Sequence, residues 1–124
     1  MTTKSPTPAM PKVVSFADPA PEPERYQPKA DRILAGDPAQ AATNLYRSAD
    51  GRFNCGVWEC QPGKWRVVFT ESEFCHLVSG VIVVTGDDGS ERTFRAGDSF
   101  VSPAGFTGTW EIIETAKKLY AYYE

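Results

Sequence analysis

Glu73 and Cys75 are the pair of residues in this sequence most capable of chemistry. Side chains alternate along a strand, so two residues separated by one lie on the same face. A carboxylate in apolar surroundings has a raised pKa and can act as a general acid or base. A thiol beside it becomes a nucleophile where a cation lowers its pKa, and Arg66 is the nearest candidate cation. Glu73 and Cys75 are therefore candidate catalytic residues. The alternative is that Glu73 is a buried, hydrogen-bonded carboxylate and Cys75 an inert core thiol.

The single histidine and the other two cysteines do not complete a metal site. His76 is three residues from Glu73, and an odd separation on a strand places the two side chains on opposite faces. Cys55, Cys60 and Cys75 form no C-x-x-C pair, which favours three reduced thiols over a zinc site or a disulfide framework.

The elements that position these residues are predicted to be strands. From residue 43 onward, short runs rich in Val, Phe, Trp and Tyr alternate with turn signals such as Asp50-Gly51 and Pro62-Gly63. No segment after residue 43 has a convincing helical period. The expected strands are 44–47, 53–60, 65–70, 74–78, 81–85, 92–95, 99–101, 109–114 and 118–123. This spacing is typical of an all-β sandwich or closed barrel.

A proline-rich segment precedes the strands. Eight of the ten prolines lie between Pro6 and Pro38, and proline disfavours both ladders and helix interiors. We therefore expect residues 1–42 to form an irregular N-terminal arm, mobile up to about residue 25, and residues 43–124 to form the barrel domain. The stretch 31–42 carries Ile33 and Leu34, and the sequence leaves open whether it packs on its own barrel or on a partner subunit.

Two glycine-anchored stretches lie about one hairpin apart. The first contains Glu73 and, after six intervening residues, Gly80; the second contains Gly97, Pro103 and Gly105. Their spacings match the end of the first motif and the beginning of the second motif of the cupin superfamily, which the chain resembles. This resemblance implies a double-stranded β-helix, that is, a jelly-roll barrel with a pocket at its mouth.

A finer resemblance comes from the stretches 56–65 and 103–111. They look like the (S)-ureidoglycine aminohydrolase-like family of small single-domain cupins. The resemblance covers residues 31 to 124 and implies a dimer. It also suggests chemistry on a ureide-like or other small nitrogenous substrate.

The sequence departs from the metal-binding pattern of these families. Where metal-binding cupins have H-x-H, this chain has Val67 and Phe69, or Arg66 and Val68 with the longer spacing, and Gly108 stands where the second motif has its histidine. Only Glu73 remains, and a lone carboxylate cannot hold a first-row divalent ion against water. We predict no firmly held metal and no other cofactor.

The same alternation predicts which side chains line the barrel. If Glu73 points inward, Cys75 and Leu77 point inward as well. If Gly108 occupies an inward position, Trp110 and Ile112 also face inward. Large aromatic residues suit both a core and the apolar wall of a pocket, so both roles stay open for the tryptophans. The candidate pocket residues are Trp58, Trp65, Arg66, Leu77, Trp110 and Ile112.

The charge and hydropathy of the sequence limit the classes of partner that we expect. With 13 basic and 16 acidic residues, the net charge of -3 argues against a nucleic-acid binder. No apolar stretch approaches the ~20 residues that span a bilayer, and no secretory signal is evident, so we expect a cytoplasmic protein without a membrane partner. The apolar runs 81–84 and 119–123 exceed what so small a barrel should expose, which predicts a homodimer.

Three functional hypotheses follow. The first is a cupin that binds a small polar metabolite in its barrel without a firmly held metal. The second is an aminohydrolase-like enzyme, which the missing ligands disfavour. The third is a metal-free isomerase or epimerase; it ranks last because His76 is expected to face away from Glu73.

Overall fold

The computed structural model describes residues 9–124, which form nine strands and one short 3-10 helix. The elements are β1 Glu24–Tyr26, η1 Ala30–Arg32, β2 Ile33–Gly36, β3 Gln40–Arg47, β4 Phe53–Cys60, β5 Gly63–Val68, β6 Ser72–Gly86, β7 Glu91–Arg95, β8 Ser99–Ser102 and β9 Thr107–Tyr123. All strand pairs are antiparallel. The expectation of an all-β fold is confirmed.

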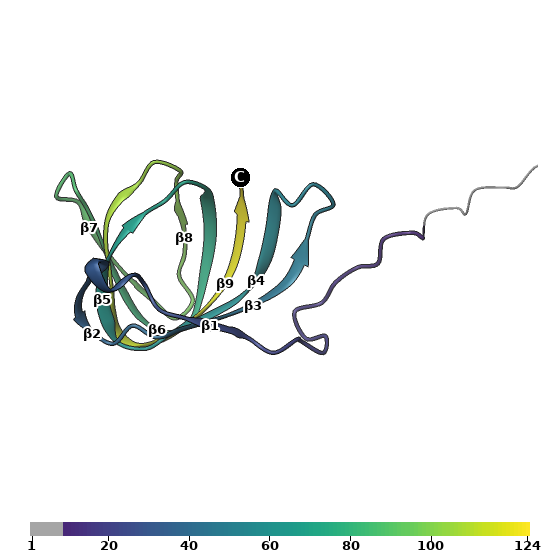
Figure 1. Cartoon of the computed structure of the whole chain (residues 1–124), viewed down its shortest axis with the longest axis horizontal. Coiled ribbons are helices and arrows are strands. Elements are labelled where there is room, and N and C mark those ends of the chain that lie inside the picture. Colours follow the sequence, from purple (N-terminus) through teal and green to yellow (C-terminus); the bar gives the residue numbers. More distant parts are fainter. Residues whose placement is uncertain (1–8) are drawn as a thin grey trace, which may run out of the picture.

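Strand β9 organises the sheet. Its first half pairs with β5 and its second half with β4, while β6 runs along its other side over nearly the whole length. Beyond β4 lie β3 and β1, beyond β5 lies β2, and β7 and β8 pair with β6. The sheet curls into a cup whose walls rise on both sides of a closed base (Figure 1). Side chains on the inner face therefore meet those of the opposite wall.

Strands β6 and β9 are each longer than predicted. Each joins two of the expected strands. In β6 a bulge at Gly80 bends the strand where a break between the strands 74–78 and 81–85 was expected. Gly80 has φ 94, and a Cβ there would overlap the Thr115 carbonyl oxygen and lie 2.7 Å from Ala116 Cα. Glycine tolerates both the positive φ and the close approach, so the strand passes from one wall of the cup to the other without ending.

The proline-rich segment contributes strands to the sheet edges. Strand β1 pairs with β3, β2 pairs with β5, and β3 begins at Gln40, ahead of the expected boundary at residue 43. Residues 33–42 thus pack on their own sheet. Residues 9–23 form no strand, and toward residue 9 this segment leads away from the cup (Figure 1). The part of the expected mobile arm at residues 1–8 lies outside the described residues.

The inner face of the cup is the hydrophobic core. Along β6, Cys75 and Leu77 are buried while Phe74 and Val78 are exposed, which confirms the predicted alternation. The run at 81–84 is only partly enclosed on both faces, because Val81 and Ile82 are buried and the next two residues are half-buried. Of the run 119–123, only Tyr120 is buried and Tyr123 is exposed, and the dimer stays a prediction. Residues 9–124 contain no helix with the length and apolarity of a membrane span.

Candidate functional site

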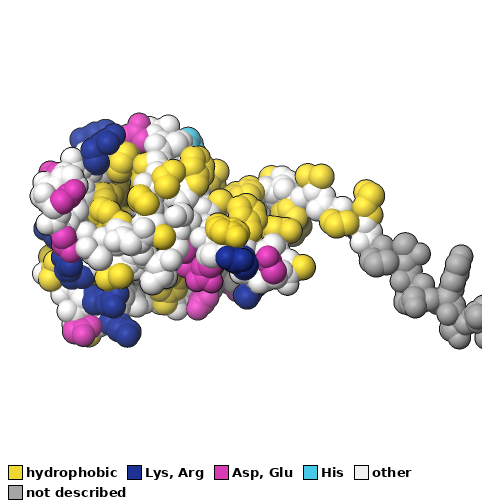
Figure 2. Space-filling view, turned by 90° about the horizontal axis from the view of Figure 1, so that it is seen from above, with side chains coloured by type: hydrophobic (Ala, Val, Ile, Leu, Met, Phe, Trp, Pro, Cys, Tyr) yellow, Lys and Arg dark blue, Asp and Glu magenta, His cyan; other side chains and the backbone are white. Residues whose placement is uncertain are grey.

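The cup encloses a cavity of about 840 Å³ that opens to solvent. Strands β3, β4, β5, β6 and β9 form its walls, and the segment from Pro21 to Arg32 borders it on one side. Seen from above, hydrophobic side chains gather on this face of the molecule, with charged side chains around them (Figure 2). A cavity of this size, apolar on its walls and polar at a few positions, has the form of a small-molecule site.

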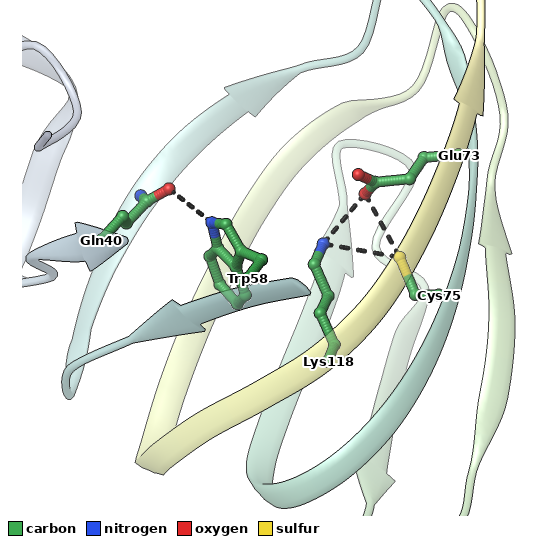
Figure 3. Close-up of polar contacts among 5 residues, drawn as sticks. All are labelled: Gln40, Trp58, Glu73, Cys75 and Lys118. Atoms are coloured by element: carbon green, nitrogen blue, oxygen red, sulfur yellow. Dashed lines mark hydrogen bonds and ion pairs between the residues drawn. The ribbon is translucent and has the colours of Figure 1, made fainter. Parts of the chain in front are cut away.

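An ion pair lies on the inner face within this cavity. The Lys118 ammonium on β9 donates to Glu73 Oε1 on β6 at 2.9 Å, and only 4% and 14% of the two side chains is exposed. Cys75 Sγ is 3.2 Å from the same carboxylate oxygen and 3.5 Å from Lys118 Nζ (Figure 3). The carboxylate expected from the sequence is therefore neutralised by a lysine.

Two indole rings also face the ammonium. Lys118 Nζ is 4.5 Å from the ring centroid of Trp58 and 4.3 Å from that of Trp110, both within cation–π range. Burial is the largest single influence and acts to lower the pKa of Lys118, but the interactions with Glu73 and Cys75 together outweigh it, so this pKa lies above its ordinary value. The side chain remains an ammonium at neutral pH.

The thiol next to the ion pair is not activated. Burial is the main cause that raises the pKa of Cys75 to about 12, and the nearby Glu73 adds to the rise while Lys118 opposes it. The expectation that Arg66 supplies the neighbouring cation is wrong. Arg66 instead binds Asp87 at 2.7 and 3.0 Å near the surface. A neutral thiol of this kind is a poor nucleophile.

Three tryptophans form the apolar wall. Trp58, Trp65 and Trp110 pack with ring centroids 5.9–6.4 Å apart, so they serve as core and as cavity wall together. The Trp58 indole N–H donates to Gln40 Oε1 at 2.9 Å (Figure 3). The Trp110 indole nitrogen is the one buried side-chain polar atom in the described part of the chain that lacks a partner.

The other predicted pocket residues divide between cavity and core. Arg66 borders the cavity, as do the tryptophans and Glu73. Leu77 and Ile112 are fully buried in the core cluster and do not border the cavity. Cys75 is likewise buried and does not border it. His76 lies on the outer face, as predicted, with Nδ1 2.8 Å from Ser99 Oγ.

The sequence profile of the EutQ-like cupin domain matches residues 47–120. The chain belongs to the EutQ-like cupin family. No curated protein sequence is significantly similar to it. The match runs from the last residue of β3 to near the end of β9 and leaves out β1 and β2.

Solved structures support the same fold for this EutQ-like cupin. A protein of unknown function from Pseudomonas syringae pv. tomato, of the DUF861 family, is 21% identical over 88% of this chain, with TM-score 0.76. This chain spans 46% of that protein. The Clostridium difficile EutQ protein is 18% identical over 79% of each chain, with TM-score 0.62. A DUF861 protein from Thermotoga maritima is 26% identical over 52% of this chain and 73% of its own, with TM-score 0.51.

The residues of this EutQ-like cupin do not fit the metal that many cupins hold. Val67, which stands at a histidine position of the motif, is buried among apolar side chains. At Gly108, a Cβ would overlap the Thr85 carbonyl oxygen, so no histidine fits there without a backbone shift. Glu73 already faces the Lys118 ammonium, which would repel a metal ion. Within residues 9–124, no group of three or more His, Cys, Asp or Glu side chains is placed to hold a metal.

Lys118 is the main site residue that the sequence analysis missed. The signal was present, because Lys118 is in phase with Trp110 and Ile112, which were predicted to face inward. Extending that alternation along β9 places Lys118 and Tyr120 inside and Lys117 outside, as the structure shows. Tyr120 donates to Asn44 Oδ1 at 2.8 Å, and burial raises its pKa, so this hydroxyl is not a base at neutral pH.

Proposed function

We propose that this EutQ-like cupin binds a small polar metabolite in its barrel cavity without a firmly held metal. The observation that carries the proposal is the cavity of about 840 Å³ with the Glu73–Lys118 ion pair in its wall. Ligand pockets in proteins commonly measure about 300–1,000 Å³ and combine apolar walls with a few placed polar groups. Here the tryptophans supply the apolar wall, and Glu73 supplies a polar group fixed in position by Lys118.

Catalysis has weaker support. The aminohydrolase-like hypothesis depends on a metal that the residues around Glu73 do not fit. The isomerase hypothesis needs an acid–base pair in the cavity, and His76 lies on the opposite face of β6. The raised pKa values of Cys75 and Tyr120 remove two further candidate bases at neutral pH. Binding without turnover uses the observed groups as they are.

A ligand screen by thermal shift tests the proposal. The panel contains amides, ureides, sugars and amino alcohols; the last are included because two similar structures are named for ethanolamine utilization or EutQ. We expect at least one class to raise the melting temperature of the wild type, and Glu73→Gln to reduce that rise. The matched control is Lys117→Met, whose side chain lies on the outer face of β9 and should leave the shift unchanged. No shift with any compound would contradict a preformed site.

A further inference from the structure

The ion pair in the cavity wall limits the charge of a ligand that binds there. Lys118 is already neutralised by Glu73 at 2.9 Å, and its side chain is almost completely buried. An anionic ligand would meet the Glu73 carboxylate beside the ammonium, so the attraction of one group would be offset by the repulsion of the other. The pair therefore offers no net positive charge to an anion.

The aromatic wall is equally unsuited to a cationic ligand. Aromatic rings attract ligand ammonium groups when their faces are free. In this protein the faces of Trp58 and Trp110 already meet the Lys118 ammonium, at 4.5 and 4.3 Å. A second cation would be repelled by Lys118 at the same place. The residues that border the cavity include four carboxylates and four basic side chains, so the wider site shows no charge preference either.

Two side chains that border the cavity and contact Lys118, Glu73 and Trp110, each carry an unpaired hydrogen-bonding group. Within residues 9–124, Glu73 Oε1 receives both contacts and Oε2 makes no hydrogen bond, which leaves one acceptor on a side chain that borders the cavity (Figure 3). The indole N–H of Trp110, another cavity residue, is a buried donor without a partner among the described residues. A buried unpaired donor costs free energy until an acceptor meets it. An acceptor-bearing group next to Trp110 and a donor next to Glu73 would satisfy both unpaired groups.

We propose that the cavity selects flat, net-neutral molecules carrying a hydrogen-bond donor beside an acceptor, such as primary amides, over the matching carboxylates and amines. This inference rests on the proposed function and names its ligand class. The amide N–H would donate to Glu73 Oε2 and the amide oxygen would accept from the Trp110 indole. The flat body would lie against the aromatic wall that Trp65 and Phe69 extend.

Three probes with the same ring test the inference: benzamide, benzoate and benzylamine. At pH 7 they are neutral, anionic and cationic, and isothermal titration calorimetry compares their dissociation constants. For the wild type we expect benzamide to bind more tightly than either charged compound by about tenfold, the difference between a met and an unmet hydrogen-bonding pattern. Lys117→Met, the outer-face control, should keep that order.

Variants of the ion pair should invert the preference in opposite directions. Glu73→Gln leaves the ammonium uncompensated, so benzoate should gain relative to benzylamine. Lys118→Met leaves the carboxylate uncompensated, so benzylamine should gain. Circular dichroism checks that each variant is folded. If Lys118→Met does not fold, the test rests on Glu73→Gln and on the order of the three dissociation constants for the wild type.

The outcomes separate this inference from the proposed function. A wild type that binds benzoate or benzylamine at least as tightly as benzamide overturns the inference while leaving a ligand site in place. If none of the three binds but the thermal-shift panel finds a ligand, a neutral ligand supports the inference and a charged one overturns it. Absence of binding by every probe and every panel compound overturns both.

Discussion

Two ion pairs of similar length lie in different surroundings in this protein. Lys118 and Glu73 meet at 2.9 Å with side chains that are 4% and 14% exposed. Arg66 and Asp87 meet at 2.7 Å with side chains that are 42% and 47% exposed. Water solvates the charges of the second pair in both the folded and the unfolded protein. The charges of the first pair lose most of their water on folding and are stabilised mainly by each other. Burial, rather than the distance between the charged atoms, therefore decides how much of the protein's stability depends on each pair.

The consequences differ for structure as well as for energy. The Arg66 guanidinium holds the pKa of Asp87 at about 2, yet both groups remain in solvent and organise little else. Lys118, by contrast, contacts two indole rings, a carboxylate and a thiol. Removing the buried lysine should therefore disturb a whole wall of the cavity.

The largest predicted effect is that of Lys118→Met. The substitution keeps an apolar chain of similar length but leaves the Glu73 carboxylate without its partner, which should lower the free energy of unfolding by about 3 kcal/mol. Urea denaturation at pH 7 measures the change. Lys117→Met is the matched control and should leave the free energy of unfolding unchanged, because that side chain lies in solvent.

A second substitution checks the cause of that loss. Glu73→Gln in the Lys118→Met background removes the uncompensated charge, so the double variant should regain a substantial part of the lost stability. A Lys118→Met protein as stable as Lys117→Met would show that the interior pair matters no more than a surface pair.

A smaller effect is expected at alkaline pH. The pKa of Cys75 is about 12 in the folded protein and 9.0 for an ordinary thiol, so the unfolded chain loses its proton first and stability falls between pH 9 and 12. The raised pKa of Lys118 acts in the same direction above about pH 10.4. Cys75→Ala should remove about 3 kcal/mol of the loss that the wild type shows between pH 8 and 11.

The readout for Cys75→Ala is the slope of stability against pH, which is independent of any packing loss at pH 8. Cys60, whose pKa burial also raises to about 12, remains in this variant and keeps part of the slope. Equal slopes for the wild type and Cys75→Ala would contradict the burial of the thiol beside the ion pair.

The smallest effect is expected at the surface pair. Arg66→Met should leave the free energy of unfolding without measurable change, because both partners are solvated and screened by salt. Urea denaturation at low and high salt provides the comparison. A loss as large as that of Lys118→Met would remove the distinction between the two pairs.

The inner face of β6 was predictable because strand alternation is a local property. Once Glu73 was placed inward, Cys75 and Leu77 followed, and the structure confirms both. The partner of Glu73 was not predictable in this way. Lys118 is 45 residues further along, and its approach depends on the register of β6 against β9, in which Leu77 stands opposite Lys118. Register between distant strands is set by the whole curled sheet.

The bend in β6 and the edge strands show two other limits. A glycine such as Gly80 suits a turn as well as a bulge within a strand. Only the pairing of β6 with β9 shows that the strand continues through Gly80. Strands β1 and β2 contain no proline; the prolines around them lie in the connections. Proline content over a segment therefore overestimated its irregularity, because proline restricts its own position and the one before it.

The metal content of the purified protein tests the central claim most directly, that a compensated ion pair occupies the barrel interior where other cupins hold a metal. Wild type and Glu73→Gln are equilibrated separately with Zn²⁺, Mn²⁺ and Fe²⁺, desalted and analysed by inductively coupled plasma mass spectrometry. We expect far less than one ion per chain in both proteins. One equivalent of a transition metal in the wild type that Glu73→Gln loses would contradict it.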